Sequence, residues 1–338
     1  MNIAVIGLGF MGAVHLKALE NISQARVVAV VDESPERLTG DLSSIQGNLG
    51  RPGERMDFSG YKKDTSVDEA LADPGIEAVD ICLPTHLHAP VTIQALRADK
   101  HVLVEKPMAL NAELAGEMLA EARQAGRVLM VAQVLRFMPQ YEALDEVLQS
   151  GRIGPVYSAI FRRRTATPTW AAWEFDSSKN GGGVFDLLVH DVDYCLHLFG
   201  TPEAVSSVGT EAMAKGIDMV VGELHYPNIG NVTITGGWHH IGEYPFSMEY
   251  TVIGERGTVE FNSDGRPPAL YESQKPKELL SLKDHDGYQA EIEHFVEACV
   301  SGTQPARCLP EESALAVKIA RIMMDSRVKK GEKVPCSL

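Results

Sequence analysis

The sequence has few cysteines, a shortage of positive charge and no long uninterrupted apolar run. Its five cysteines are odd in number, widely scattered and without a Cys-x-x-Cys pair, so neither a disulfide framework nor a thiolate metal site is predicted. Lysine and arginine total 31 against 46 aspartates and glutamates, for a net charge of −15. That balance argues against nucleic acid and anionic membranes as main partners, because both bind basic surfaces. No apolar run approaches the roughly 18 residues that span a bilayer.

What remains is the composition of an ordinary globular protein. Hydrophobic residues make up 44% of the 338 positions and charged residues 23%, which is typical of soluble domains. The length suffices for two domains with proper cores. The chain enters its first apolar segment at once, without a basic n-region or a cleavage signal. We therefore expect a cytoplasmic protein.

The N-terminal stretch has the pattern of a dinucleotide-binding turn. An apolar, largely β-branched run at 3–6 leads through Gly7-x-Gly9-x-x-Gly12 into a helix-like run at 11–19. Gly7 permits a tight turn, Gly9 lets a pyrophosphate lie against bare backbone, and Gly12 lets the helix pack closely on the strand. Free N–H groups and the positive end of the helix dipole then favour a diphosphate.

An acidic residue stands at the distance that such a site requires. Asp32 follows a second apolar run at 27–31 and lies 20 residues beyond Gly12 (32 − 12). In that position a carboxylate accepts hydrogen bonds from an adenosine ribose and repels a 2′-phosphate. The sequence thus predicts an NAD site, with NADP as the alternative cofactor. The structural alternative is a Gly-rich turn beside an ordinary surface aspartate.

Strand and helix patterns alternate over residues 1–135, which predicts a parallel, doubly wound sheet. Ser34 and Pro35 predict the start of one helix, and Asn111 can cap another that ends at Gly126. Such sheets bind ligands beyond the carboxyl ends of their strands. The segments that follow predicted strand ends are 7–12, Asp32, 84–88 and 105–107.

Beyond residue 150 the pattern changes to consecutive strands. Over 246–252 apolar and polar residues alternate, as in a sheet with one covered face. We predict an α/β Rossmann doubly wound parallel sheet plus an α+β C-terminal domain with a large, mostly antiparallel open-faced sheet. The expected domains are 1–125 and 126–338, with the last helix able to pack back on the first domain. The open face predicts a homo-oligomer, a dimer or a tetramer.

Two elements carry candidate chemistry for hydride transfer, which needs a proton acceptor and a cation beside the reacting oxygen. Lys106 follows a strand at 102–104 and precedes Pro107; its structural alternative is a solvated surface charge. Asp186 and His190 follow three glycines and are spaced i, i+4, so the carboxylate can orient the imidazole. Their structural alternative is a satisfied core pair.

The motifs, in this order, resemble the glucose–fructose oxidoreductase/inositol dehydrogenase/rhizopine catabolism (Gfo/Idh/MocA) family. The likeness covers nearly the whole chain. One departure is Leu188, which stands where many members have glycine; in this position the chain resembles some inositol dehydrogenase-like relatives. The segments that carry it are 7–12 with His15, Asp32, Pro84-Thr85 with His88, 101–107, 181–183 with Asp186 and His190, and 314–334. His15 itself is expected only to pack beside the turn.

The resemblance implies a role for each matching residue. Lys106 contacts the nicotinamide ribose and the reacting hydroxyl, His190 accepts the proton, and Asp186 bonds the substrate and sets the state of His190. Glu105 holds the nicotinamide ribose, and the Lys106–Pro107 peptide is cis, as is common in the family. The implied cofactor-binding residues are Gly7, Gly9, Phe10, Met11, Gly12, Asp32, Leu83, Pro84, Thr85, His88, Glu105 and Lys106. The implied substrate-binding residues are Lys106, Arg136, Arg164, Trp173, Asp186 and His190; no metal is expected.

Three functions from different classes are compatible with these residues. The first is an NAD-dependent dehydrogenase acting on a secondary hydroxyl of a sugar, sugar derivative or cyclic polyol. The second is an NAD-dependent glycoside hydrolase that borrows and returns the hydride. The third, a non-catalytic dinucleotide-sensing regulator, is disfavoured because such relatives tend to lose the lysine found here at position 106.

Overall fold

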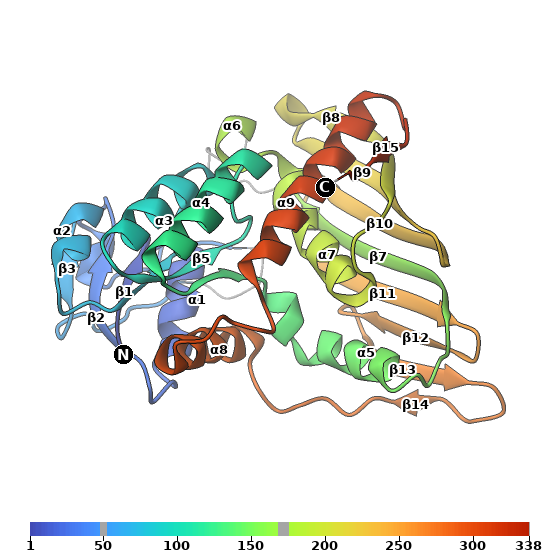
Figure 1. Ribbon diagram of the computed structural model, residues 1–338, viewed down its shortest axis with the longest axis horizontal. Coiled ribbons are helices and arrows are strands. Elements are labelled where there is room, and N and C mark those ends of the chain that lie inside the picture. Colours follow the sequence, from blue (N-terminus) through green and yellow to red (C-terminus); the bar gives the residue numbers. More distant parts are fainter. Residues whose placement is uncertain (48–52, 168–175, 338) are drawn as a thin grey trace. The chain divides into compact units, whose positions relative to one another are not determined.

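The computed structural model describes residues 1–47, 53–167 and 176–337 (Figure 1). These residues form two compact units, each built on one sheet. Unit 1 comprises Met1–Val134 and Asp286–Ala314, and unit 2 comprises Leu135–His285 and the chain from Leu315 onward. Unit 1 therefore continues past the expected boundary at residue 125, because the strand at Leu129–Ala132 pairs with the strand before it.

The sheet of unit 1 is fully parallel and has the strand order β3-β2-β1-β4-β5-β6. The order reverses between β1 and β4, which creates the crevice where dinucleotides bind in such sheets. Its strands are β1 (Asn2–Ile6), β2 (Arg26–Val31), β3 (Lys62–Asp64), β4 (Ala78–Ile81), β5 (His101–Glu105) and β6 (Leu129–Ala132). Its helices are α1 (Phe10–Leu19), α2 (Val67–Ala72), α3 (His88–Arg97), α4 (Ala112–Ala125) and α8 (Gly287–Ser301).

Local capping explains where the helices of unit 1 begin and end. The Asn111 side chain accepts a hydrogen bond from the Leu114 N–H at 2.9 Å, and α4 ends at Gly126 with φ +63°, as the sequence predicts. The helix predicted from Pro35 is only a single 3-10 turn at Arg37–Thr39, because Gly40 adopts φ +88° directly after it.

Unit 2 contains a sheet in the order β14-β13-β12-β11-β7-β10-β9-β8-β15. Only the β7–β10 pair is parallel, and the other pairs are antiparallel. The predicted fold class is therefore confirmed. The strands are β7 (Val156–Ala166), β8 (Ala204–Ala212), β9 (Ile217–Tyr226), β10 (Ile229–His240), β11 (Ser247–Gly254), β12 (Gly257–Asn262), β13 (Arg266–Glu272), β14 (Glu278–Leu279) and β15 (Val334–Pro335). The helices are α5 (Pro139–Gln149), the short α6 (Ser177–Asn180), α7 (Gly183–Phe199) and α9 (Pro310–Val328), which begins in unit 1.

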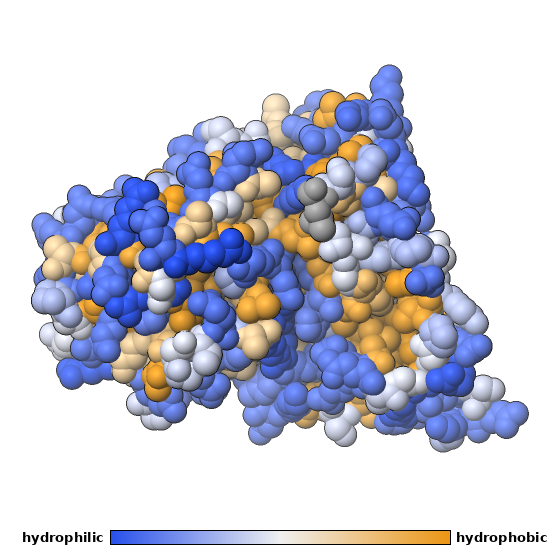
Figure 2. All heavy atoms as spheres, viewed as in Figure 1, coloured by the Kyte–Doolittle hydropathy of each residue, from blue (hydrophilic) through white to orange (hydrophobic). Residues whose placement is uncertain are grey.

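Helix α7 covers one face of the unit 2 sheet, where it contacts β7, β9 and β10. An aromatic cluster fills the space beneath, with the Tyr141 and Tyr194 rings 4.9 Å apart and edge-on. The opposite face is not covered by α7 and bears exposed apolar side chains at Ile160, Val221 and Ile253. In the space-filling view most of the visible surface is hydrophilic, with apolar residues gathered beside α5 (Figure 2).

The helix that returns to unit 1 is α8, which packs against α1. The last helix, α9, lies in unit 2 from Leu315 onward, where the Ser326 hydroxyl accepts a hydrogen bond from the Ser207 N–H at 2.8 Å. No helix among the described residues is both long and apolar enough to pass through a bilayer.

Candidate functional site

The glycine turn after β1 has the geometry that a pyrophosphate requires. Gly7 adopts φ +95°, and a side chain there would lie 2.5 Å from the Cys82 carbonyl oxygen. A Cβ on Gly12 would lie 1.9 Å from the Gly7 carbonyl oxygen, so only glycine lets α1 start this close to the turn. Apart from its neighbours in the chain, no described residue lies within 4 Å of a Cβ placed on Gly9, which leaves this part of the turn open. Phe10 and Met11 begin α1 at this opening.

Asp32 is fixed at the carboxyl end of β2 by backbone hydrogen bonds. Its Oδ2 accepts from the Leu8 N–H at 2.7 Å and its Oδ1 from the Ser34 N–H at 2.9 Å. The Arg37 guanidinium lies 3.3 Å from Oδ2 and is 44% exposed. The carboxylate therefore ties the glycine turn to the end of β2, beside the place where an adenosine ribose binds in such folds.

The loop after β4 contains Leu83, Pro84 and Thr85, and His88 starts α3. His88 is buried, with Nδ1 2.7 Å from the Pro107 carbonyl oxygen and Nε2 2.7 Å from that of Leu83. Burial lowers the pKa of His88, although its contacts with the Pro107 and Leu83 carbonyls oppose the shift. The His88 ring thus links the loop after β4 to the segment after β5, and the cofactor contact expected here stays a prediction.

The end of β5 carries the Glu105-Lys106-Pro107 segment. The Lys106–Pro107 peptide is cis, as the family resemblance implies. Glu105 is buried, and its Oε2 accepts from the Lys106 N–H at 3.0 Å, whereas Lys106 is half-buried. Burial disfavours the carboxylate, but contact with His15 outweighs it and lowers the pKa of Glu105.

In unit 2 the first turns of α7 present two polar side chains. Between Gly183 and Leu196 every residue is buried except Asp186 and His190. Their i, i+4 spacing places them on one helix face. The structure thus places these two predicted residues together on the partly exposed face of α7.

The glycines before α7 serve packing as well as access. A Cβ on Gly183 would lie 2.4 Å from the Trp238 ring, so glycine lets the helix start against β10. The Asp218 Oδ2 accepts a hydrogen bond from the Val184 N–H at 2.9 Å, which satisfies one of the free donors of the first helical turn.

The arginines expected to contact substrate pair with acidic residues of unit 2, and their contact with substrate stays a prediction. Arg136 is 2% exposed, and its Nε and Nη2 each lie 2.8 Å from an Asp193 oxygen. Arg163 pairs with Asp191 on α7. Because successive strand residues point to opposite faces, Arg164 lies on the face away from α7, 3.7 Å from Glu249, and is not beside Asp186 and His190. Trp173 lies outside the described residues.

Three further residues near the strand ends of unit 1 were not singled out from the sequence. Gln133 follows β6 and is buried, and its amide atoms have no hydrogen-bond partner among the described residues. Asp80 and Glu291 lie buried near His15. A polar residue within an otherwise apolar strand was the only signal for Asp80, and nothing local marks Glu291, which reaches the sheet from α8.

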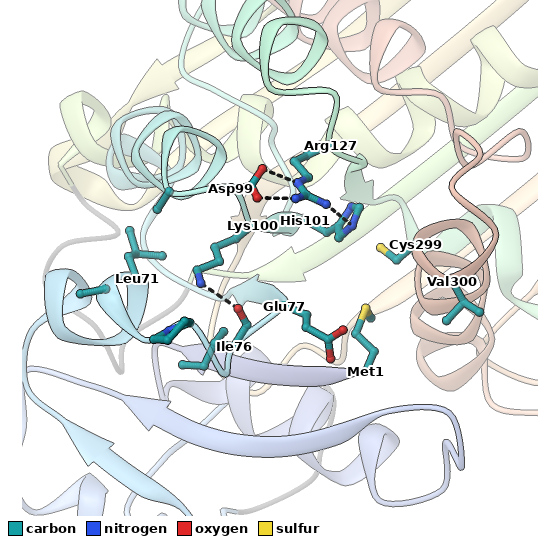
Figure 3. A pocket seen from close by; sticks show the side chains of 13 residues that line it. Met1, Leu71, Ile76, Glu77, Asp99, Lys100, His101, Arg127, Cys299 and Val300 are labelled. Carbon is teal, nitrogen blue, oxygen red and sulfur yellow. Dashed lines mark hydrogen bonds and ion pairs between the residues drawn. The ribbon is translucent and has the colours of Figure 1, made fainter.

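A hollow of about 740 Å³ in unit 1 is separate from these residues. It is lined by residues that include Met1, Glu77, His101 and Cys299, and Figure 3 shows Arg127 paired with Asp99 at its rim. Because Glu77 and His101 lie at the starts of β4 and β5, the hollow lies at the amino ends of the strands, opposite the end where cofactors bind.

Known proteins match the chain over most of its length. Residues 1–133 match the profile of an oxidoreductase family with an NAD-binding Rossmann fold, and residues 141–260 match that of the GFO/IDH/MocA C-terminal domain. Inositol 2-dehydrogenase of Rhizobium meliloti is 29% identical over 322 residues, which cover 90% of this chain and 91% of the relative. An uncharacterized oxidoreductase of Synechocystis is 30% identical over 286 residues, or 78% of this chain and 72% of the relative.

The fold resembles that of a dehydrogenase whose structure has been solved. Levoglucosan dehydrogenase in complex with NADH and levoglucosan has a TM-score of 0.84 at 20% identity, covering 100% of both chains. The predicted cofactor is confirmed, because unit 1 is an NAD-binding Rossmann domain.

Proposed function

We propose, from the premise that this chain belongs to the Gfo/Idh/MocA oxidoreductase family, that it oxidises a secondary hydroxyl of a sugar, a sugar derivative or an inositol-like polyol. The observation that carries the proposal is the pair Asp186 and His190, the only accessible polar residues on the first turns of α7. The match to an inositol dehydrogenase over 90% of this chain supports the substrate class.

In the proposed mechanism the bound NAD supplies the acceptor for hydride, and the protein manages the proton and the charge. His190 takes the hydroxyl proton as a general base, and Asp186 orients the imidazole and bonds the substrate. The Lys106 ammonium stabilises the negative charge that develops on the reacting oxygen. The mechanism requires Lys106 and His190 to flank one substrate hydroxyl.

The proposal is tested by replacing Lys106 with methionine, which keeps the length of the side chain but removes its charge. We expect Lys106→Met to abolish turnover while the Kd for NAD stays within about threefold, because the diphosphate and adenosine contacts are elsewhere. Nicotinamide absorbance is followed over a panel of inositols, hexoses, anhydrosugars and glycosides. The exposed Lys63→Met on β3 is the matched control and should retain full activity.

Each outcome of this experiment has a clear meaning. Retained turnover in Lys106→Met would contradict the catalytic role. Glycoside cleavage without accumulation of NADH would favour the hydride-recycling hydrolase over net oxidation. Binding of NAD with no turnover on any substrate would favour a regulator.

We further propose that the protein is a homo-oligomer that associates through the open face of the unit 2 sheet. The support is the exposed apolar side chains Ile160, Val221 and Ile253, which lie among hydroxyl and charged side chains on that face, since interfaces combine apolar and polar groups.

A further inference from the structure

A buried cluster of ionisable side chains lies within unit 1, beneath the glycine turn and the end of β5. His15 comes from α1, Asp80 from β4, Glu105 from β5 and Glu291 from α8. All four are buried, and the imidazole of His15 has no exposed surface. Buried charges are costly unless they are paired, so the arrangement of the cluster determines its charge.

The His15 ring lies between two carboxylates. Its Nδ1 is 2.9 and 3.0 Å from the two Asp80 oxygens, and its Nε2 is 3.0 Å from Glu105 Oε1. A neutral imidazole carries only one N–H and would turn a lone pair toward one of these carboxylates. The geometry therefore favours the imidazolium, which hydrogen-bonds Asp80 through Nδ1 and forms an ion pair with Glu105 at Nε2, without a hydrogen bond at that nitrogen among the described residues.

The electrostatics of the cluster agree with this geometry. Burial opposes a charged ring, but the Asp80 carboxylate outweighs it and raises the pKa of His15 well above its usual value. Burial raises the pKa of Glu291 well above that of an ordinary glutamate, although the nearby His15 opposes the shift. The ion pairs of the cluster are those that His15 makes with Asp80 and Glu105.

We propose that His15 is a positioning residue: it clamps the Glu105 carboxylate at the end of β5 and so holds the adjoining Lys106 in its working position. The inference rests on the role proposed above for Lys106. Glu105 is suited to transmit the constraint, because Oε1 contacts His15 while Oε2 accepts from the Lys106 N–H at 3.0 Å. One carboxylate thus joins the buried ring to the backbone of the catalytic candidate.

The clamp is tested with His15→Gln, which removes the cation but retains polar atoms and similar size. We expect kcat to fall about tenfold to a hundredfold, because small misplacements of reacting groups lower the rate by this much. The Kd for NAD should change less than about threefold. Without the imidazolium the pKa of buried Glu105 rises, so the acid limb of the kcat profile moves to higher pH. A merely structural role would lower Tm but leave that limb in place.

A second variant keeps the test valid should His15→Gln fail to fold. In Asp80→Asn the amide oxygen still accepts from Nδ1, but the carboxylate charge is gone, so the pKa of His15 falls. The imidazolium is then lost at lower pH, and activity declines earlier on the alkaline side. The control is His101→Gln at the opposite end of β5, which should keep the wild-type profile. The other titratable groups that face the cluster are Cys82, His88, Lys106, Tyr288 and Asp286.

Wild-type kcat and pH limits in folded His15→Gln or Asp80→Asn would overturn the clamp. So would a stoichiometric metal ion found by elemental analysis of the purified protein, because His15, Asp80 and Cys82 could together hold one and Nδ1 would then be a ligand rather than a donor. Lys106→Met is measured alongside: if it retains turnover, the proposed function fails first. If it is inactive while the His15 and Asp80 variants behave as wild type, only the clamp fails.

Discussion

At the residue scale, Asp32 favours NAD, whereas the neighbouring Arg37 would favour NADP. Its carboxylate disfavours a 2′-phosphate, whereas the guanidinium of Arg37, 3.3 Å away, would attract one. With Asp32 intact the arginine is partly neutralised by the ion pair. Cofactor preference therefore depends on which of these two charges dominates at the ribose.

We expect Asp32→Ala to lower the ratio of kcat/KM for NAD to that for NADP by about tenfold or more, equivalent to about 1.4 kcal/mol. The freed Arg37 should then bind the 2′-phosphate, so Asp32→Ala with Arg37→Met should lose the gained NADP activity. Initial rates with both cofactors measure the effect. An unchanged ratio in the single variant would refute the role of Asp32.

At the scale of elements, α7 is held by two buried ion pairs. Arg136 binds Asp193 through two nitrogens, and Arg163 binds Asp191 in the same way. Paired geometry of this kind orients both partners. These contacts fix the rotation of α7, and hence the direction in which its Asp186 and His190 face.

Arg136→Met should be strongly destabilising, by about 3–5 kcal/mol, because it leaves the buried Asp193 carboxylate without a counterion. Denaturant unfolding measures the loss. Arg97→Met breaks the more exposed pair with Glu121 and should cost less than about 1 kcal/mol.

The double variant Arg136→Met, Asp193→Leu separates anchoring from substrate contact. If Arg136 only anchors α7, the double variant should regain most of the stability and activity, because no charge is left buried. A stable but inactive double variant would instead support the prediction that Arg136 contacts the substrate.

At the scale of the whole molecule, one face of the unit 2 sheet is covered by α7, and no helix that the structure describes covers the other. Alternate residues of β7 are buried beneath α7, while Ile160 and Arg162 point to the other side. The exposed face mixes apolar, hydroxyl and charged side chains, including the Arg162–Glu249 pair. A second copy of the chain could pack there in a two-fold arrangement.

We expect Val221→Lys, on β9 in this face, to reduce the mass measured by light scattering to that of a smaller assembly, because a desolvated lysine would oppose packing. Ile241→Lys is the control, since this side chain is 96% exposed just after β10. A wild-type protein that is already monomeric, or a Val221→Lys variant of unchanged mass, would contradict the proposed interface.

Local sequence patterns were enough to predict the fold of the cofactor-binding unit, unit 1. The strand ahead of Gly7, the spacing to Asp32 and the Asn111 cap are set by neighbours in sequence, and each appears where predicted. Two elements were not predicted, for different reasons. The three-residue β3 is mostly charged and has no local apolar pattern. Helix α5 has apolar residues at helical spacing, Tyr141, Leu144 and Val147, and this pattern could have predicted it.

The sequence by itself determined the family, the parallel sheet and the NAD-binding turn, because these depend on short-range spacing and backbone freedom. Only the tertiary structure decided which charged groups face one another: Arg136 meets Asp193 57 positions away, and His15 meets Asp80 65 positions away. Such pairs depend on how separate helices and strands pack, and no local pattern specifies the partner. For that reason the roles of His15, His88 and Arg136 emerge only when the folded chain brings their partners together.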